Sequence, residues 1–241
     1  MRADALTILA ELAGDDRLVH VERIPGRPAR HGELATPLDH DVWWSYGLPI
    51  LWAHQVEAID HIRAGRSVVV ATGTASGKSL CYQLPVAEAV TGPDRGTAIC
   101  IFPTKALAQD QLRMITSAHV PRLVAATYDG DTGPEARTWV RRHANVVLTN
   151  PEMLHGAILP SHRRWANFLG QLRYVVVDEL HTLRGIFGSH AAHVLRRLRR
   201  LCARYGSTPT FIFSSATIGD PARLASELCG QPVVPVVDDA S

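Results

Sequence analysis

The run Thr72–Ser79, TGTASGKS, follows the apolar stretch Ser67–Ala71 and is suited to bind phosphate. Small residues let backbone N–H groups close around the phosphates of a nucleotide, and the start of a following helix favours an anion. Lys78 supplies a positive charge and Ser79 a hydroxyl for Mg²⁺. The usual pattern has Gly where this chain has Thr72. The run predicts an ATP site contacted by Thr72, Gly73, Thr74, Ala75, Ser76, Gly77, Lys78 and Ser79.

Two carboxylates follow another apolar stretch, in the segment Tyr174–His181, YVVVDELH. Ligands of open α/β sheets bind beyond the carboxyl ends of strands, where these carboxylates would lie. There Asp178 can hold Mg²⁺, and Glu179 can orient and deprotonate an attacking water. A solvated acidic turn after a strand would look the same, but the phosphate-binding run upstream favours a nucleotide site. We predict Lys78, Asp178 and Glu179 as catalytic residues, and Ser79 and Asp178 as Mg²⁺ ligands.

Short apolar stretches alternate with segments of helical apolar spacing along most of the chain. This alternation is typical of a mostly parallel sheet with helices on both faces, so we expect an α/β fold. The expected strands are Ser67–Ala71, Thr97–Phe102, Leu123–Thr127, Val146–Thr149, Tyr174–Asp178 and Thr210–Ser214. The expected helices are Gly77–Val90, Thr104–Ser117, Pro134–His143, His190–Tyr205 and Asp220–Cys229.

Three parts are expected along the chain. Residues 1–45 form an N-terminal accessory segment, in which helical spacing at Ala3–Ala13 precedes several structure-breaking Pro and Gly residues. Residues 46–230 form the ATP-binding domain, and residues 231–241 form a linker toward a further domain.

Composition agrees with a globular cytoplasmic protein. The formal net charge is only +2, so nucleic-acid binding must be local rather than driven by a general basic field. No apolar run reaches the ~18 residues of a membrane helix, and the N-terminus shows no export signal. No two of the four cysteines form a Cys-x-x-Cys pair, which indicates reduced core thiols and no metal cluster. They are Cys81, Cys100, Cys202 and Cys229.

The order of these motifs resembles the superfamily 2 DExH-box helicases. In chain order the motifs are the Q motif at Leu51–Ile59 (LWAHQVEAI), motif I at Thr74–Ser79, motif Ia at Pro103–Gln111 (PTKALAQDQ), motif Ib at Thr149–Glu152 (TNPE), the DExH box at Asp178–His181 and motif III at Ser215–Thr217. Ala75 stands where most members have Gly. The resemblance implies a RecA-like P-loop domain with ATP and Mg²⁺ as cofactors. It also implies that Gln55 reads the adenine.

The same resemblance implies contacts to the backbone of one nucleic-acid strand, with little sequence specificity. The implied contact residues are Thr104, Lys105, Thr149, Asn150 and Pro151. Motif Ib could instead be a plain strand-to-helix turn, with Asn150 before Pro151. His181, Ser215 and Thr217 are implied to couple hydrolysis to strand separation. The alternatives are a packed histidine and hydroxyls that satisfy buried backbone groups.

A narrower resemblance is to the MrfA-type DNA repair helicases, which carry a DUF1998-type C-terminal region. The strings TASGKSLCYQLP, TNPEMLH and DELHTLRGIFGSH carry it, with YDGDT at Tyr128–Thr132. It implies a DNA translocase that moves 3′ to 5′. An RNA helicase and a nucleotide-dependent binding module without motor activity remain alternatives.

The family also implies a second RecA-like domain, absent from this sequence, that supplies arginine fingers to the γ-phosphate. Residues 1–241 alone should therefore bind nucleotide better than they hydrolyse it. Two further features are expected to be structural. The arginines of LRRLRR at Leu195–Arg200 keep helical apolar spacing and should form a solvated face. Trp43, Trp44 and Tyr46 could stack on adenine or pack the accessory segment onto the domain, and we favour packing.

Overall fold

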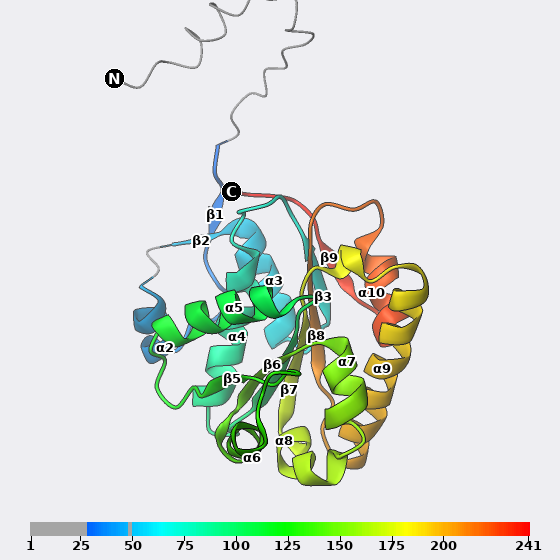
Figure 1. The fold of residues 1–241 in the computed structure, drawn as a ribbon. Helices are drawn as coiled ribbons and strands as arrows, with labels where there is room; N and C mark the ends of the chain where they lie inside the picture. Colours follow the sequence, from blue (N-terminus) through cyan, green and yellow to red (C-terminus); the bar gives the residue numbers. More distant parts are fainter. Residues whose placement is uncertain (1–27, 48–49) are drawn as a thin grey trace, which may run out of the picture.

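A seven-stranded sheet forms the centre of the molecule, and every pair of neighbouring strands in it is parallel (Figure 1). The computed structural model describes residues 28–47 and 50–241, so the helix expected at Ala3–Ala13 lies outside the described residues. In spatial order the strands are β5 (Ala125–Thr127), β6 (Val146–Thr149), β4 (Thr97–Ile101), β7 (Leu172–Val177), β8 (Thr210–Ser215), β3 (Val68–Ala71) and β9 (Val234–Val236). The predicted α/β class with a parallel sheet is confirmed.

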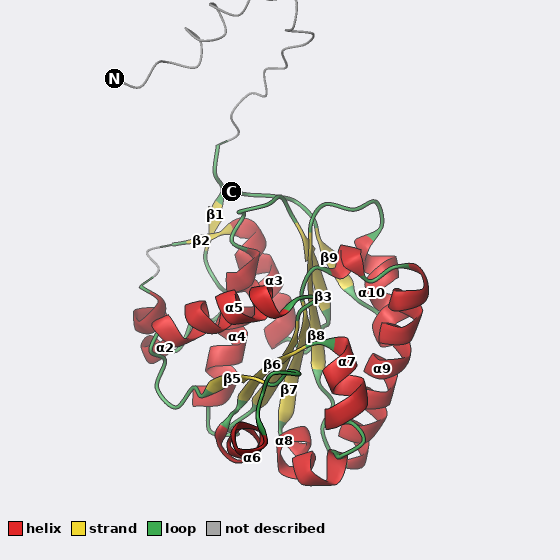
Figure 2. Cartoon of the chain, viewed as in Figure 1, coloured by secondary structure: helices red, strands yellow, loops and turns green. Residues whose placement is uncertain are grey.

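Helices cover both faces of this sheet (Figure 2). One face carries α3 (Ala53–Arg63), α4 (Lys78–Thr91) and α5 (Lys105–Ser117). The other carries α6 (Pro134–His143), α7 (Pro151–Met153), α8 (Ala166–Gly170), α9 (Gly185–Arg204) and α10 (Pro221–Cys229). The helix α2 (His40–Tyr46) packs outside α3 and α4. The chain also forms a short π-helix, η1 (Leu154–Ile158), and two short 3-10 helices, η2 (His162–Trp165) and η3 (Leu180–Thr182).

The apolar runs became strands because the sheet is buried on both faces. Successive side chains of a strand point to opposite faces. In β3, Val69 belongs to the core under α9 and α10, whereas Val68 and Val70 belong to the core under α3, α4 and α5. All three are at most 1% exposed, so every position of the strand must be apolar. Among the described residues, no helix combines the length and apolar character needed to cross a bilayer.

Two segments outside residues 46–230 pair with strands of the ATP-binding domain. The strand β1 (His31–Gly32) pairs antiparallel with β2 (Leu51–Trp52), at the entry to α3. Near the other end of the sequence, β9 pairs with β3 as an edge strand, where Pro235 is tolerated because it owes no hydrogen bond to a further strand. Residues of the expected linker thus belong to the sheet.

The helix α9 begins at Gly185, five residues before the expected start at His190. From sequence, Gly185 and Gly188 favour a loop in this stretch. In the fold both lie in the first turn of the helix. Gly185 has φ +59, and a Cβ on Gly188 would lie 2.5 Å from the carbonyl oxygen of Leu183. A larger residue at position 188 would therefore push the helix away from the preceding turn.

Candidate nucleotide and motor site

The phosphate-binding run forms a compact loop between β3 and α4. Ser76 Oγ donates to Gly73 O at 2.8 Å, so the 2.6 Å contact between Thr72 Oγ1 and Ser76 Oγ has Thr72 as donor. Lys78 Nζ donates to the carbonyl oxygens of Thr72 and Gly73. Thr72 is 1% exposed. The residue that departs from the usual Gly therefore braces the loop from within.

Two positions of the loop adopt backbone angles that favour glycine. Gly77 has φ +70, and a Cβ there would lie 2.5 Å from Gln55 Nε2 and 3.0 Å from the Trp52 ring. Ala75 has φ +61. This is the position where the resembled helicases carry Gly, so the structure gives a physical reason for that Gly and a strain that this chain accepts.

Gln55 ties the loop to the start of α3. Its side chain is 2% exposed, accepts from Trp52 N at 3.0 Å and donates to Gly77 O at 3.1 Å. The residue expected to read adenine thus lies beside the loop. In this conformation both the oxygen and the nitrogen of its side-chain amide form hydrogen bonds within the protein, and adenine recognition stays a prediction.

Asp178 follows β7 directly and is held from two directions. Its Oδ1 accepts from Ser214 Oγ of β8 and from Glu179 N at 3.0 Å. Burial raises the pKa of Asp178, and the charge of Glu179 adds to the rise. The hydrogen bonds from Ser214 and Glu179 N, and the charge of Lys78, oppose it. Because β3 and β7 both run parallel to β8, Asp178 and the Lys78 loop follow strands at the same edge of the sheet.

Glu179 adopts the left-handed conformation with φ +54, uncommon outside glycine. Its Oε2 lies 3.1 Å from His181 Nδ1, which is ion-pair distance, although the angle is not that of a hydrogen bond. Such strain gathers at functional sites, where the surrounding structure enforces it. The turn directs the Glu179 side chain toward His181.

The motif III hydroxyls do not reach His181 by a hydrogen bond among the described residues. Ser215 is 1% exposed, and its Oγ has no hydrogen-bond partner there, so it does not satisfy a buried backbone group either. Thr217 is exposed. The coupling role of these residues stays a prediction. Their position is fixed by register, because Ser215 pairs with Ala71 at the start of the phosphate-binding loop.

The expected nucleic-acid residues lie after β4 and β6, which are neighbours in the sheet. Thr104 caps α5 by accepting from Leu107 N, and Asn150 caps α7 by accepting from Met153 N at 2.8 Å. Lys105 Nζ forms an ion pair with Asp131 at 2.6 Å. A backbone hydrogen bond joins the two segments: Phe102 N, just after β4, donates to the carbonyl of Thr149 at the end of β6.

Two residues of the expected nucleic-acid set face inward. Thr149 is 3% exposed and donates its hydroxyl to Tyr128 O at 2.7 Å, and Pro151 is buried at the first position of α7. Their side chains support the turn, so at Thr149 only backbone groups could contact a nucleic acid, and Pro151 has no backbone N–H to donate to a phosphate. Contacts by the set as a whole stay predictions.

The structure adds residues that the motifs did not single out. Ser214 was assigned only as the last residue of a strand, yet it holds Asp178. Gln111, the last residue of motif Ia, accepts from Tyr82 Oη at 2.8 Å and donates to Ser79 Oγ at 3.4 Å. The register of β7 and β8, which pairs Val177 with Phe213, would have predicted the first of these.

A second pair of unexpected residues joins the C-terminal segment to the loop. Gly73 N donates to Asp239 Oδ2 at 3.0 Å. His54 Nδ1 accepts from Ala240 N at 3.2 Å, so its Nε2 is the donor to Ser76 O at 2.9 Å. Burial lowers the pKa of His54, which favours this neutral form. Nothing in the sequence pattern links residues so far apart.

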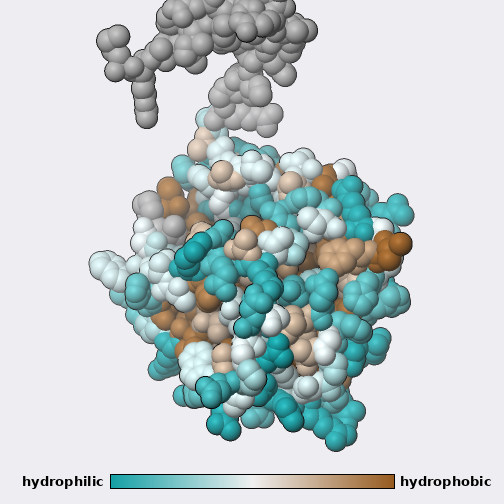
Figure 3. Space-filling view, viewed as in Figure 1, coloured by the Kyte–Doolittle hydropathy of each residue, from teal (hydrophilic) through white to brown (hydrophobic). Residues whose placement is uncertain are grey.

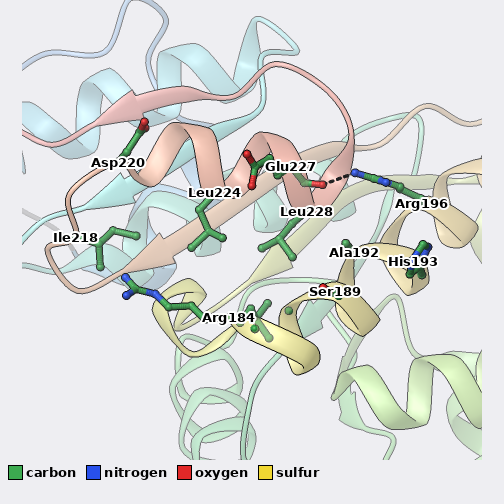
Figure 4. A pocket seen from close by; sticks show the side chains of 13 residues that line it. Arg184, Ser189, Ala192, His193, Arg196, Ile218, Asp220, Leu224, Glu227 and Leu228 are labelled. Atoms are coloured by element: carbon green, nitrogen blue, oxygen red, sulfur yellow. Dashed lines mark hydrogen bonds between the residues drawn. The ribbon is translucent and has the colours of Figure 1, made fainter.

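Of the accessory aromatic residues, Trp43 and Tyr46 pack against the α3–α4 core, whereas Trp44 is 78% exposed. A separate cavity of about 700 Å³ lies between α9 and α10 (Figure 4). Across it, Arg196 Nη2 on α9 donates a hydrogen bond to the backbone carbonyl of Glu227 on α10 at 2.6 Å. None of the predicted nucleotide residues lines this cavity, so it is not the ATP site.

Comparison with known proteins places these features in a family. The chain is 43% identical to the uncharacterized ATP-dependent helicase YprA of Bacillus subtilis over 99% of its length, and 42% identical to the ATP-dependent helicase HRQ1 of Saccharomyces cerevisiae over 89%. It spans only 33% and 20% of those relatives. Its structure matches that of the DUF1998 helicase MrfA bound to DNA and AMPPNP with a TM-score of 0.93, at 41% identity over 99% of this chain and 34% of that one. The expected RecA-like fold and the likeness to MrfA-type helicases are confirmed. The DEAD/DEAH box helicase model matches residues 52–224, and the chain belongs to that family.

Proposed function

We propose that this chain is the first motor domain of an ATP-dependent DNA helicase that moves 3′ to 5′ in DNA repair. The observation that carries the proposal is the convergence of the Lys78 loop and the Asp178–Glu179 turn on the carboxyl edge of the sheet. The similarity to a helicase captured with DNA and an ATP analogue supports it. We also propose a cytoplasmic location, which four free, buried cysteines support.

ATP is expected to bind between Gln55, the loop Thr72–Ser79 and the Asp178–Glu179 turn. Two features suit a phosphate chain: Gly77 lets the loop pack closely against Gln55, and the Lys78 ammonium lies at the loop, bonded to its carbonyl oxygens. The described residues contain no cluster of three His, Cys, Asp or Glu side chains. That fits Mg²⁺, which takes one or two protein ligands and completes its shell with phosphates and water.

The residues that would hold Mg²⁺ are Ser79 and Asp178. When bound, Mg²⁺ neutralises charge that develops on the phosphates. Glu179 is proposed to take a proton from the attacking water, and the position of its carboxylate beside His181 supports this role. Arginine fingers from a second RecA-like domain would complete the site, which is why we expect residues 1–241 alone to turn over ATP slowly.

The nucleic acid is expected to be DNA, contacted along one strand by the segments that follow β4 and β6. Helix N-termini and backbone N–H groups bind phosphates without reading bases. Exposed Thr104 and Lys105 and the half-buried Asn150 are the side chains available for such contacts. Groups of this kind bind the phosphates of DNA and RNA alike, so the choice of DNA rests on the relatives.

The test is ATP hydrolysis by the full-length protein, with and without single-stranded DNA or RNA of equal length. The proposal expects DNA to raise the rate strongly and RNA to raise it much less. A Lys78→Ala protein is the control for contaminating ATPase. Stimulation by RNA alone would make it an RNA helicase, and ATP binding without stimulation by either would favour a module without motor activity.

A further inference from the structure

A basic region lies at the amino ends of the strands, at the opposite edge of the sheet from the expected ATP site. It is a groove of about 870 Å³ between the C-terminal end of α6 and the η2–α8 segment. These elements lie together at the lower edge of Figure 1, where Figure 3 shows a mainly hydrophilic surface. The groove is lined by six arginines and a histidine: Arg95, Arg122, Arg141, Arg142, Arg163, Arg164 and His143.

No carboxylate lines this groove, and among the described residues none of its arginines has a carboxylate partner. Other described basic residues do have one, such as Arg63 with Glu88 and Arg113 with Asp110. The chain as a whole carries a formal charge of only +2, so this concentration of positive charge is local. Local positive potential of this kind is what a polyanion recognises.

Local folding accounts for only part of the cluster. Arg141 and Arg142 lie in the last turn of α6, where positive charge complements the helix dipole. Arg95 and Arg122 have φ +47 and +64, a conformation that disfavours residues with a Cβ by roughly 1–2 kcal/mol. Both come from different loops, yet both side chains reach the same groove. The presence of arginine at these two positions is therefore better explained by its charge than by its backbone preference.

An exposed aromatic ring stands beside the arginines. Trp139 on α6 is 48% exposed, and its ring stacks on His143, with centroids 5.2 Å apart and planes at 25°. His143 itself lines the groove. Basic side chains with an accessible aromatic face are the usual means of binding single-stranded nucleic acid, since any base can stack on the ring. An acidic protein segment would need the charge but not the ring.

We propose that this groove binds a second segment of single-stranded nucleic acid, with phosphates on the arginines and a base on Trp139. The proposal rests on the proposed helicase function. The strand β6 connects the two regions, with Asn145 in the groove at its start and Asn150 after its end. At roughly 3.3 Å per residue this is about 17 Å in a straight line. Because β6 is buried, a strand that joins the two regions must pass around the β5 edge of the sheet, which a long strand can do and a very short oligonucleotide cannot.

The test compares short and long single-stranded DNA on the full-length protein. Arg142→Glu with Arg163→Glu should lower the slope of log affinity against log salt for the long DNA by roughly 1.4 or more, at ~0.7 per lost phosphate contact. Trp139→Ala should weaken binding of the long DNA roughly 5- to 100-fold with the slope unchanged, as loss of one stacked base would. ATPase stimulated by saturating short DNA should stay at the parent level.

Matched controls separate the groove from general charge and from folding. Arg66→Glu with Arg200→Glu makes the same charge change at exposed residues outside the groove and should leave the slope nearly unchanged. Arg142→Lys with Arg163→Lys should keep most of the slope, because a point charge suffices for a phosphate. The folding of all variants is compared by thermal melting. If the glutamate pair melts early, the lysine pair and Trp139→Ala decide the outcome. The lysine pair must then bind the long DNA like the parent, and Trp139→Ala must bind it more weakly than the parent.

The outcomes are distinct. Unchanged binding of long DNA by both the arginine and tryptophan variants overturns the proposal. So does a loss seen only with a polyglutamate peptide, which would assign the groove to acidic protein, or a loss seen only with duplex DNA. If the parent protein shows no DNA-stimulated ATPase, the helicase function itself fails. If that activity is present and only the long-DNA effect is missing, the groove alone is wrong.

Discussion

Two neighbouring regions of the sheet's carboxyl edge hold their side chains in different ways. On the nucleotide side, which comprises Gln55, the loop Thr72–Ser79 and the Asp178–Glu179 turn, hydrogen bonds run between motifs. Gln55 reaches Gly77, and Ser214 reaches Asp178. On the nucleic-acid side, after β4 and β6, two exposed or half-buried polar side chains have only local partners: Thr104 and Asn150 each cap the helix they precede.

The difference fits the chemistry of each region. Hydrolysis needs several groups fixed relative to one another, so residues from separate strands must brace each other. Contact with a phosphate backbone needs only oriented backbone N–H groups at helix N-termini, and side chains there can serve the turn itself. We expect single substitutions on the nucleotide side to cause large losses of ATP binding or hydrolysis. Single substitutions on the nucleic-acid side should change DNA affinity only a few-fold.

The largest effect is expected from Lys78→Ala. This change removes the only described positive side chain that bonds the loop carbonyls, and with it the charge facing the phosphates. ATP affinity should fall below detection by calorimetry while the thermal melting curve stays close to the parent's. A folded variant that binds ATP like the parent would refute the assignment of this loop.

Glu179→Gln should separate binding from chemistry. The amide keeps the shape of the turn but cannot accept the proton of the attacking water, so turnover in the full-length protein should fall by about 10²-fold or more. ATP binding, measured in parallel, should persist. If hydrolysis continues at the parent rate, Glu179 is not the base, and His181 beside it becomes the residue to test.

Ser214→Ala tests the brace between β8 and Asp178. The Ser214 hydroxyl lowers the pKa of Asp178 against the rise caused by burial. Without it that pKa rises further, so the carboxylate form is lost at a higher pH as the pH falls. The acid limb of the ATPase pH profile should therefore move to higher pH. Ser215→Ala, one residue along, should leave that limb in place because Ser215 does not bond Asp178.

These predictions also show what the sequence could supply. The apolar runs located the strands, and motif spacing placed Lys78, Asp178 and Glu179 at strand ends, because both follow from periodicity and parallel topology. Ser214 was missed because its role depends on the register between β7 and β8, which no local pattern encodes. The edge strand β9 was missed because a short segment with Pro235 looks like a linker until a neighbouring strand is known.

On the nucleic-acid side, Asp131→Asn should have a modest effect of opposite sign. Asp131 pairs with Lys105, a predicted phosphate contact, and hydrogen bonding to Asp131 raises the pKa of that lysine. Removing the carboxylate frees the ammonium, so affinity for single-stranded DNA should rise roughly two- to fivefold at low salt, as expected for an exposed ion pair. Asp110→Asn is the matched control, since it frees Arg113 on the same helix. Equal gains from both variants would show a general charge effect and not a role for Lys105.

The smallest effect is expected at Ala75. Its φ of +61 is strained for alanine but open to glycine, so Ala75→Gly should stabilise the protein by about 0.5–1 kcal/mol and raise its melting temperature by roughly 1–4 °C. The same change at Ala203, an exposed residue of α9, should destabilise by up to about 1 kcal/mol, because glycine costs backbone entropy in a helix. Opposite signs at the two sites would assign the effect to backbone conformation. If Ala75→Gly also weakened ATP binding several-fold, the strain itself would help to shape the loop, and the nucleotide side would depend on backbone as well as on side-chain bracing.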